Sequence, residues 1–125
     1  MKHILLIDDN TIDNYINKVI ISKAKIAHLI TTKNSGLEAL AFLTSLHASG
    51  KSFPEIIFLD LQMPEMDGFQ FLDQYTKFSE EAKKNSNIYM LTSSNNPEDV
   101  KKAGDCLSIK NFFNKPLSSE LVAQI

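Results

Sequence analysis

Five polar side chains that can take part in chemistry each stand at the end of a short apolar segment of the chain. Asp8, Asp9 and Asp60 follow two such segments, and Thr92 and Lys115 end two more. Carboxylates that lie close together repel one another unless a cation lies between them, and oxygen ligands are those that Mg²⁺ prefers. A carboxylate beside such an ion can act as a nucleophile, while a hydroxyl and an ammonium group can hold phosphoryl oxygens. These residue types therefore indicate phosphoryl chemistry, provided that the fold brings them together.

The segments that carry these residues have the pattern of strands alternating with helices. Short apolar runs predict strands at residues 4–7, 25–31, 56–59, 88–91 and 111–114, the second of them weak and near a sheet edge. Helices are predicted from Asn10 or Thr11, across residues 37–47, from Gly68, across residues 97–104, and from Ser118 or Ser119 to Ile125. Residues 79–87 are interpreted as a helix tail followed by a solvated loop. Strictly alternating strands and helices predict an α/β fold with a parallel sheet covered on both faces.

The first and last of these helices carry further expectations. The first has one apolar stripe, typical of an amphipathic helix, formed by Ile12, Tyr15, Ile16, Val19 and Ile20. The last is only about two turns long, which is short for a closing helix. We therefore expect that it is trimmed, or that the chain is the front of something longer.

The predicted sheet gives the five polar residues a common location. All strands of a parallel sheet point the same way, so their carboxyl ends share one rim. Each residue alone has a more ordinary explanation, since acids cap turns, threonines end strands and lysines are solvated. The joint arrangement is harder to explain in this way, because each group ends its own strand. We therefore expect the five side chains to converge.

Length, charge and composition restrict the classes of protein to which the chain can belong. A chain of 125 residues suits one domain, residues 1–125, and a net charge of −2 gives no basic excess for nucleic acid. No apolar stretch reaches the roughly 20 residues that span a bilayer, and the N-terminus has no signal-peptide pattern. Cys106 is the only cysteine, so no internal disulfide can form. These features predict a cytoplasmic protein that binds neither nucleic acid nor membrane.

The ordered set of motifs resembles the CheY-like receiver domain of bacterial two-component response regulators. The motifs are Asp8-Asp9, Asp60 with Met63-Pro64 and Met66-Asp67-Gly68, Thr92-Ser93, and Lys115-Pro116, and the resemblance covers nearly the whole chain. It implies a flavodoxin-like (βα)5 fold, a doubly wound parallel five-stranded sheet of order 2-1-3-4-5 with helices on both faces.

The resemblance also implies which residues carry the function. Asp60 would accept a phosphoryl group from a phosphohistidine of a sensor histidine kinase or phosphotransfer protein. Mg²⁺ would be bound directly by Asp9, Asp60 and the backbone carbonyl of Gln62, with Asp8 acting mainly through metal-bound water. Thr92 and Lys115 would bind the phosphoryl group and complete the catalytic set.

A conformational switch would follow phosphorylation in such a domain. Thr92 and the aromatic residue Phe112 would form it, and the peptide bond before Pro116 would be cis. The family usually has Ala where Ser93 stands, and many relatives have an acid or amide where Ser94 stands. Signal would leave through protein contacts at residues 97–104, 111–114 and 118–125, to an unknown downstream protein or in a phosphorylation-dependent dimer. No turnover of an external substrate is expected.

Three other functions compete with this interpretation. A Mg²⁺-dependent phosphatase with an Asp nucleophile typically places an acid two residues later, where this chain has Gln62, which cannot transfer protons. A nucleotide or flavin binder would need a phosphate-binding motif, but the chain has no G-x-G-x-x-G or P-loop and only 4 glycines. A receiver that binds partners without phosphorylation would not need the full set of five site residues.

Overall fold

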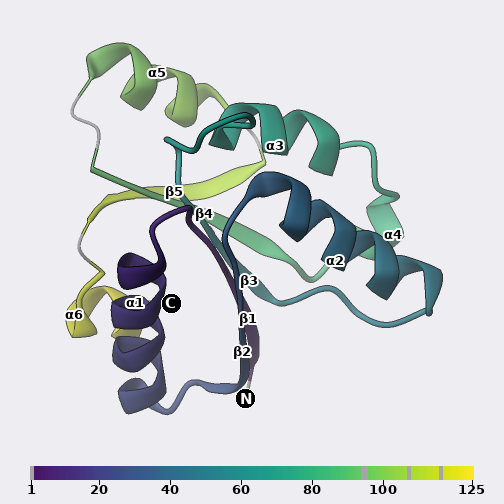
Figure 1. Cartoon of the computed structure of the whole chain (residues 1–125), viewed down its shortest axis with the longest axis horizontal. Coiled ribbons are helices and arrows are strands. Elements are labelled where there is room, and N and C mark those ends of the chain that lie inside the picture. Colours follow the sequence, from purple (N-terminus) through teal and green to yellow (C-terminus); the bar gives the residue numbers. More distant parts are fainter. Residues whose placement is uncertain (1, 94–95, 107, 116) are drawn as a thin grey trace.

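The fold is a five-stranded parallel sheet with helices on both faces, seen in a computed structural model that describes residues 2–93, 96–106, 108–115 and 117–125 (Figure 1). The strands are β1 (Lys2–Ile7), β2 (Ala27–Lys33), β3 (Ile56–Leu59), β4 (Asn87–Thr92) and β5 (Ile109–Asn114). The helices are α1 (Thr11–Ala24), α2 (Gly36–Ala48), α3 (Gly68–Tyr75), α4 (Glu80–Lys83), α5 (Pro97–Asp105) and α6 (Ser119–Ala123). The sheet order β2-β1-β3-β4-β5 confirms the predicted order and places β2 at one edge.

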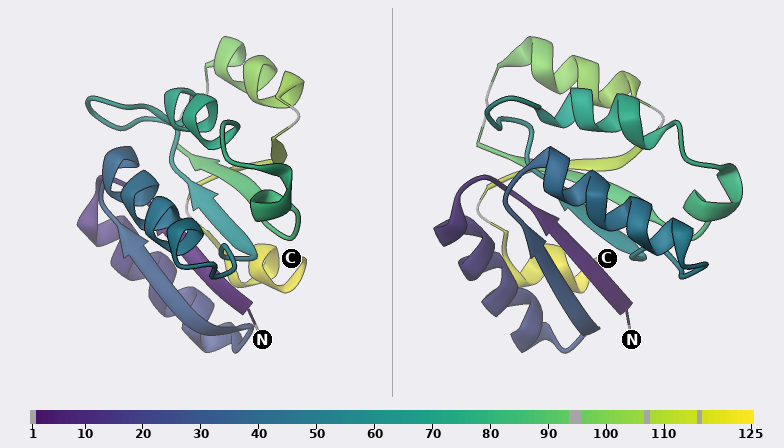
Figure 2. Two further views of the ribbon diagram at one scale, coloured as in Figure 1. Left: turned by 90° about the vertical axis from the view of Figure 1, so that its right-hand side faces the viewer. Right: turned by 45° about the vertical axis from the view of Figure 1, so that its right-hand side comes forward.

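Each central strand has an unbroken apolar run that packs against helices on both sides of the sheet. Neighbouring residues of a strand point to opposite faces, so Leu5 and Ile7 of β1 join one core while Ile4 and Leu6 join the other. The first core includes residues of α2 and α3, and the second includes residues of α1 and α6. Figure 2 shows the two helix layers from further directions. This burial on both faces explains the unbroken apolar runs in the sequence.

Backbone hydrogen bonds continue the sheet for one residue past the strand ends. The amide of Asp60 donates to the carbonyl of Ile7 at 2.9 Å, so the acid that follows β3 is fixed beside β1. The amide of Lys115 likewise donates to the carbonyl of Thr92 at 2.8 Å, beyond β5. The candidate site residues are therefore held by the sheet itself rather than by loose loops.

The apolar stripe predicted for α1 is not the face that packs on the sheet. Ile12 and Tyr15 are 67% and 69% exposed, and the residues of α1 that are buried are Asn14, Asn17 and Ile21. Asn14 is buried because its Nδ2 donates to the backbone carbonyl of Asp8 at 2.9 Å, which ties the helix to the end of β1. Most of the stripe therefore lies outside the core, and among its residues Ile20 packs against the second core.

Smaller differences concern the segment before β4 and the ends of two strands. A separate short helix, α4, lies within residues 79–87, where a helix tail and loop were predicted. It begins where the Ser79 side chain accepts a hydrogen bond from the amide of Ala82 at 3.2 Å. Strand β2 runs to Lys33, two residues further than predicted, and β5 begins at Ile109, two residues earlier than predicted. The predictions for Ser94 and Pro116 fall outside the described residues.

Candidate functional site

Three carboxylates meet at the carboxyl-terminal rim of the sheet. Asp8 follows β1 and Asp60 follows β3, and their residues are only 3% and 5% exposed, whereas Asp9 is exposed. One carboxylate oxygen from each of the three lies within 4.8 Å of the other two. Clustered carboxylate oxygens of this kind fit a hard divalent cation, which takes oxygen ligands and retains water on its open side.

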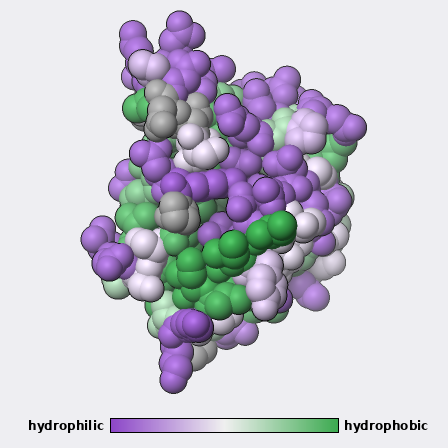
Figure 3. Space-filling view, turned by 60° about the vertical axis from the view of Figure 1, so that its left-hand side comes forward, coloured by the Kyte–Doolittle hydropathy of each residue, from purple (hydrophilic) through white to green (hydrophobic). Residues whose placement is uncertain are grey.

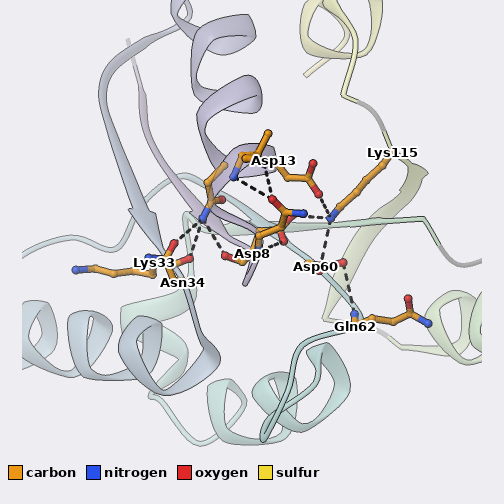
Figure 4. A network of polar contacts seen from close by, with 10 residues as sticks. Asp8, Asp13, Lys33, Asn34, Asp60, Gln62 and Lys115 are labelled. Carbon is orange, nitrogen blue, oxygen red and sulfur yellow. Dashed lines mark hydrogen bonds and ion pairs between the residues drawn. The ribbon is translucent and has the colours of Figure 1, made fainter.

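The ammonium group of Lys115 faces this carboxylate cluster from the end of β5 (Figure 4). Its Nζ lies 2.6 Å from Oδ2 of Asp8 and 3.5 Å from Oδ2 of Asp60. A third carboxylate contributes from the first turn of α1, where Oδ2 of Asp13 lies 3.0 Å from the same Nζ. The structure therefore brings a single cationic group against three acids that come from three different elements.

Burial and like charge determine how Asp60 titrates. Removal from water raises the pKa of this carboxyl from 3.8 to about 7, and the neighbouring charge of Asp8 adds to the shift, while Lys115 opposes it. Burial lowers the pKa of Lys115, but the hydrogen bonds to Asp8 and Asp13 outweigh it and leave the pKa above its usual value. Without a cation, Asp60 is therefore protonated in part near neutral pH, and a bound cation would favour its ionised form.

The loop after β3 is fixed by its own hydrogen bonds. Asp67 and Gln70 form a reciprocal capping box at the start of α3, with distances of 2.8 and 2.9 Å. The amide of Gly68 donates to the carbonyl of Leu61 at 2.8 Å, which closes the loop against the strand end. Within the loop, the amide of Gln62 points back to Oδ1 of Asp60 at 3.4 Å (Figure 4). This loop places Gln62 beside the acid, and its role as a carbonyl ligand of a metal ion stays a prediction.

Two predicted switch residues occupy neighbouring strands. Thr92 ends β4 and is fully buried, and Ser93 beyond it is exposed. Phe112 of β5 pairs with Met90 in the sheet register and is partly buried against the core that contains α2 and α3. Their arrangement is compatible with a coupled motion, but their roles as switch residues, like the roles assigned to the other site residues, stay predictions.

Asp13 and the buried asparagines of α1 were missed by the sequence analysis. Asp13 looked like an ordinary acid in a first helical turn, where negative charge is favourable. Asn14 and Asn17 line a small cavity of about 10 Å³ under the site, together with Asp8 and Asp60. The signal in the sequence was the pair of asparagines three apart in α1, which lie on the same face of the helix as Ile21.

A parallel doubly wound sheet with acids, a hydroxyl and an ammonium group gathered on its carboxyl-terminal rim defines a class of phosphoryl-accepting signalling domains. The family model for the response regulator receiver domain matches residues 4–125. The chain therefore belongs to the response regulator receiver domain family. Within the described residues, none of the helices has the length and apolar character needed to cross a membrane.

Several known proteins are similar to this chain over most of its length. The crystal structure of a two component response regulator from Cytophaga hutchinsonii is 31% identical with a TM-score of 0.89, covering 98% of this chain and 91% of that one. Response regulator Rcp1 of Synechocystis sp. is 31% identical over 79% of this chain and 67% of its own length. Its Mn(2+)-bound crystal structure has a TM-score of 0.77 at 26% identity, covering 99% of this chain and 88% of that one. Hybrid signal transduction histidine kinase L of Dictyostelium discoideum is 34% identical over 98% of this chain, which spans 7% of that protein.

Membership in the family defines the general activity of the chain. Receiver domains are signalling modules of two-component systems and not enzymes that act on external substrates. They interact with histidine kinases or phosphotransfer proteins, and they bind a divalent metal at an acidic pocket. The cluster of Asp8, Asp9 and Asp60 is the corresponding acidic pocket in this chain.

Proposed function

We propose that this chain is a phosphorylation-dependent switch that accepts a phosphoryl group on Asp60 from a phosphohistidine, in a reaction that needs Mg²⁺. The observation that carries the proposal is the convergence of Asp60 with Asp8, Asp9 and Lys115 at one rim of the sheet. Mg²⁺ in this acidic pocket would neutralise the carboxylates and orient the oxygens of the incoming phosphoryl group. Asp9 and Asp60 would bind it directly with the Gln62 carbonyl, and Asp8 through water.

The transfer itself exchanges one bond for another. A carboxylate oxygen of Asp60 attacks the phosphorus, the P–O bond forms, and the P–N bond to the donor imidazole breaks. The released imidazole takes up a proton from solvent. Lys115 stabilises the negative oxygens of the group in transfer, and the Thr92 hydroxyl binds one of them afterwards. Because the domain carries the phosphoryl group on itself, its product is an altered surface and not a released molecule.

Replacement of Asp60 by Asn is expected to abolish labelling and leave the fold intact. The parent chain should take up one acid-labile phosphoryl group when incubated with acetyl phosphate and Mg²⁺, because Asp60 supplies the attacking carboxylate oxygen while Asp8 and Asp9 would hold the metal ion. Intact mass and gel-shift measurements would count the group. The variant Asp73→Asn, which removes an exposed carboxylate of α3, is the matched control and should label like the parent. Equal labelling of the Asp60→Asn variant would refute the assignment.

An exposed apolar patch lies on α1, the helix whose first turn reaches the site. The patch consists of Ile12, Tyr15 and Ile16, and Figure 3 shows hydrophobic surface bordered by hydrophilic atoms on this side of the molecule. Exposed large apolar side chains grouped beside a reaction site are typical of a protein contact surface. A protein donor has to bring its phosphohistidine to Asp60, so the patch supports a histidine kinase or phosphotransfer protein as the donor.

Replacement of Tyr15 by Ala is expected to slow phosphotransfer from a protein donor about tenfold and to leave labelling by acetyl phosphate unchanged. An aromatic residue at the centre of a contact surface commonly contributes about 1–2 kcal/mol to binding, while a small donor touches no such surface. The assay would use the histidine kinase that labels the parent fastest in a screen of the source genome. The variant Leu29→Ala removes an exposed apolar residue of β2 and serves as control. Equal slowing with both donors would place the defect in the site and not in the patch.

The proposed output surface contains β5, which lies at the other edge of the sheet, and the helices α5 and α6 that precede and follow it in the chain. A phosphoryl group on Asp60 would draw Thr92 toward it, and Phe112 would turn into the space that Thr92 leaves. Burying a Phe side chain contributes about 1.5–3 kcal/mol relative to exposure, enough to bias a two-state switch. This would remodel the face formed by α5, β5 and α6, where a downstream protein or a second copy of the chain would bind. We also propose that residues 1–125 act together as one receiver domain.

A further inference from the structure

Lys115 is bound more closely by two acids than by the proposed phosphoacceptor. Its Nζ is 2.6 Å from Asp8 and 3.0 Å from Asp13, but 3.5 Å from Asp60. An ammonium group has three N–H donors in a tetrahedral arrangement, so two strong hydrogen bonds leave one donor for any further oxygen. Of the two closer acids, Asp8 belongs to the rim cluster, whereas Asp13 lies outside the set of residues to which a role has been assigned.

Asp13 reaches Lys115 because of the way in which α1 begins. The side chain of Asn10 accepts hydrogen bonds from the amides of Ile12 and Asp13, at 2.9 and 3.1 Å, which fixes the first turn of the helix. That turn is anchored to the rim, because the amide of Asn10 donates to Oδ1 of Asp8 at 3.0 Å. The Asp13 side chain is 35% exposed and so stands at the mouth of the site, between solvent and the ammonium group.

This contact competes with the function assigned to Lys115. Stabilisation of a phosphoryl group on Asp60 requires the ammonium group to turn toward the new oxygens, while the carboxylate of Asp13 holds it on the side of α1. The contact also adds a negative charge near a site that has to accept a phosphoryl group carrying negative charge of its own. Both effects oppose the phosphorylated form, and neither requires contact between Asp13 and the reacting atoms.

We propose that Asp13 is a positioning residue that retains the Lys115 ammonium group beside Asp8 and so disfavours the phosphorylated state of the domain. The inference rests on the proposed function, because it assumes that a phosphoryl group forms on Asp60. In this role Asp13 raises the free energy of the phosphorylated form relative to the unphosphorylated one. Its removal leaves the phosphoryl transfer reaction itself intact.

The variant Asp13→Asn tests the inference by its affinity for beryllofluoride, a stable mimic of the phosphoryl group, in saturating Mg²⁺. Loss of the competing carboxylate is expected to tighten binding about three- to tenfold, equivalent to about 0.7–1.4 kcal/mol. The chain contains no Trp, so binding is best followed by amide NMR shifts or calorimetry. The gain should shrink at high salt, because the Asp13 side chain is partly exposed and its charge is screened.

A Mg²⁺ titration without beryllofluoride separates positioning from a merely structural role. Removal of a negative charge near the site should weaken Mg²⁺ binding slightly or leave it unchanged, so only the phosphoryl mimic should bind more tightly. Asp13→Glu keeps the charge and should bind both ligands as the parent does. Glu65→Gln removes an exposed carboxylate of the β3–α3 loop and controls for net charge. NMR spectra of each variant would confirm that its fold is retained.

The outcomes distinguish this inference from the proposed function. If the parent binds beryllofluoride and the Asp13→Asn variant binds it equally or more weakly, the positioning role is refuted and the proposed function stands. If Glu65→Gln tightens binding as much as Asp13→Asn does, net charge and not the contact with Lys115 is responsible, and the inference also fails. If the parent neither binds beryllofluoride nor accepts a phosphoryl group from acetyl phosphate, the proposed function is wrong and the inference is overturned with it.

Discussion

The metal-free domain is expected to lose stability as the pH rises, and the Asp60→Asn variant is expected not to share this loss. Burial and the charge of Asp8 raise the pKa of Asp60 from 3.8 to about 7. Between these two values the folded state holds a proton that the unfolded state has released, so the free energy of unfolding falls with each pH unit. This loss of stability is absent below the pKa that Asp60 has in the unfolded state. It is complete above the pKa that Asp60 has in the folded state.

The size of this loss of stability is set by the difference between the two pKa values of Asp60. One pKa unit corresponds to about 1.4 kcal/mol, but Lys115 and solvent at the rim relax around the new charge. We therefore expect a total loss of about 2 kcal/mol, or about 8 °C in Tm for a domain of this length. Thermal unfolding at about pH 5 and about pH 8 in a chelating buffer would measure it, and the stability advantage of the Asp60→Asn variant over the parent should be larger at the higher pH.

Two controls make this result specific to the site. The pKa of His3 is lowered by burial, so this residue destabilises the fold as the pH falls, but its contribution cancels when parent and variant are compared at each pH. Addition of Mg²⁺ should reverse the slope of the parent, because the cation binds the ionised carboxylates of the folded state only. Parallel pH profiles of stability for parent and variant would show that burial and the charge of Asp8 do not raise the pKa of Asp60.

The predictable part of the fold was the part that depends on local pattern. The unbroken apolar runs of β1, β3 and β4 indicate strands buried on both faces, and the acid or hydroxyl after each run marks its carboxyl end. Once the strands are parallel, their ends must share a rim, so the convergence of Asp8, Asp60 and Lys115 follows from topology. The actual distances could not be predicted, since they depend on register and side-chain rotamers.

The sequence was least informative where its pattern does not show which part of the protein a side chain contacts. Periodicity shows that Ile12, Tyr15 and Ile16 share one face of α1, but not whether that face is turned to the sheet or to solvent. The orientation is set instead by Asn14, whose amide bonds the carbonyls of Asp8 and Lys33. The second of these contacts joins residues 19 positions apart, and local sequence does not encode it.

Asp13 escaped prediction for a related reason. Its local explanation, an acid in a first helical turn, is sufficient by itself, so nothing in the neighbouring sequence indicated a further role. Its contact with Lys115 joins residues 102 positions apart. Only the folded chain brings the two together, because β5 returns to the rim on which α1 begins.

Gly68 is expected to be the glycine whose replacement by Ala is most harmful. A Cβ atom there would lie 2.9 Å from the carbonyl oxygen of Asp60 and 3.0 Å from the Cα of Leu61. Both are backbone atoms at the end of β3, so they cannot turn aside as a side chain can, and either α3 or the phosphoacceptor has to move. We expect a loss of about 2–3 kcal/mol in the free energy of unfolding, as for other overpacked sites, with slower labelling of Asp60.

Two other glycines provide a graded series for this prediction. At Gly36 the nearest atom to a new Cβ is the Sδ of Met66, at 2.7 Å, and a flexible thioether can move, so Gly36→Ala should cost less than Gly68→Ala. At Gly104 no atom lies within 4 Å among the contacts of the described residues, and Ala in α5 should stabilise the fold by about 0.5–1 kcal/mol. Chemical denaturation of the three variants would rank them, and acetyl phosphate labelling would report on Asp60. A Gly68→Ala variant as stable and as reactive as the parent would mean that α3 can shift without displacing Asp60, so that the close approach of helix and strand end does not fix the phosphoacceptor.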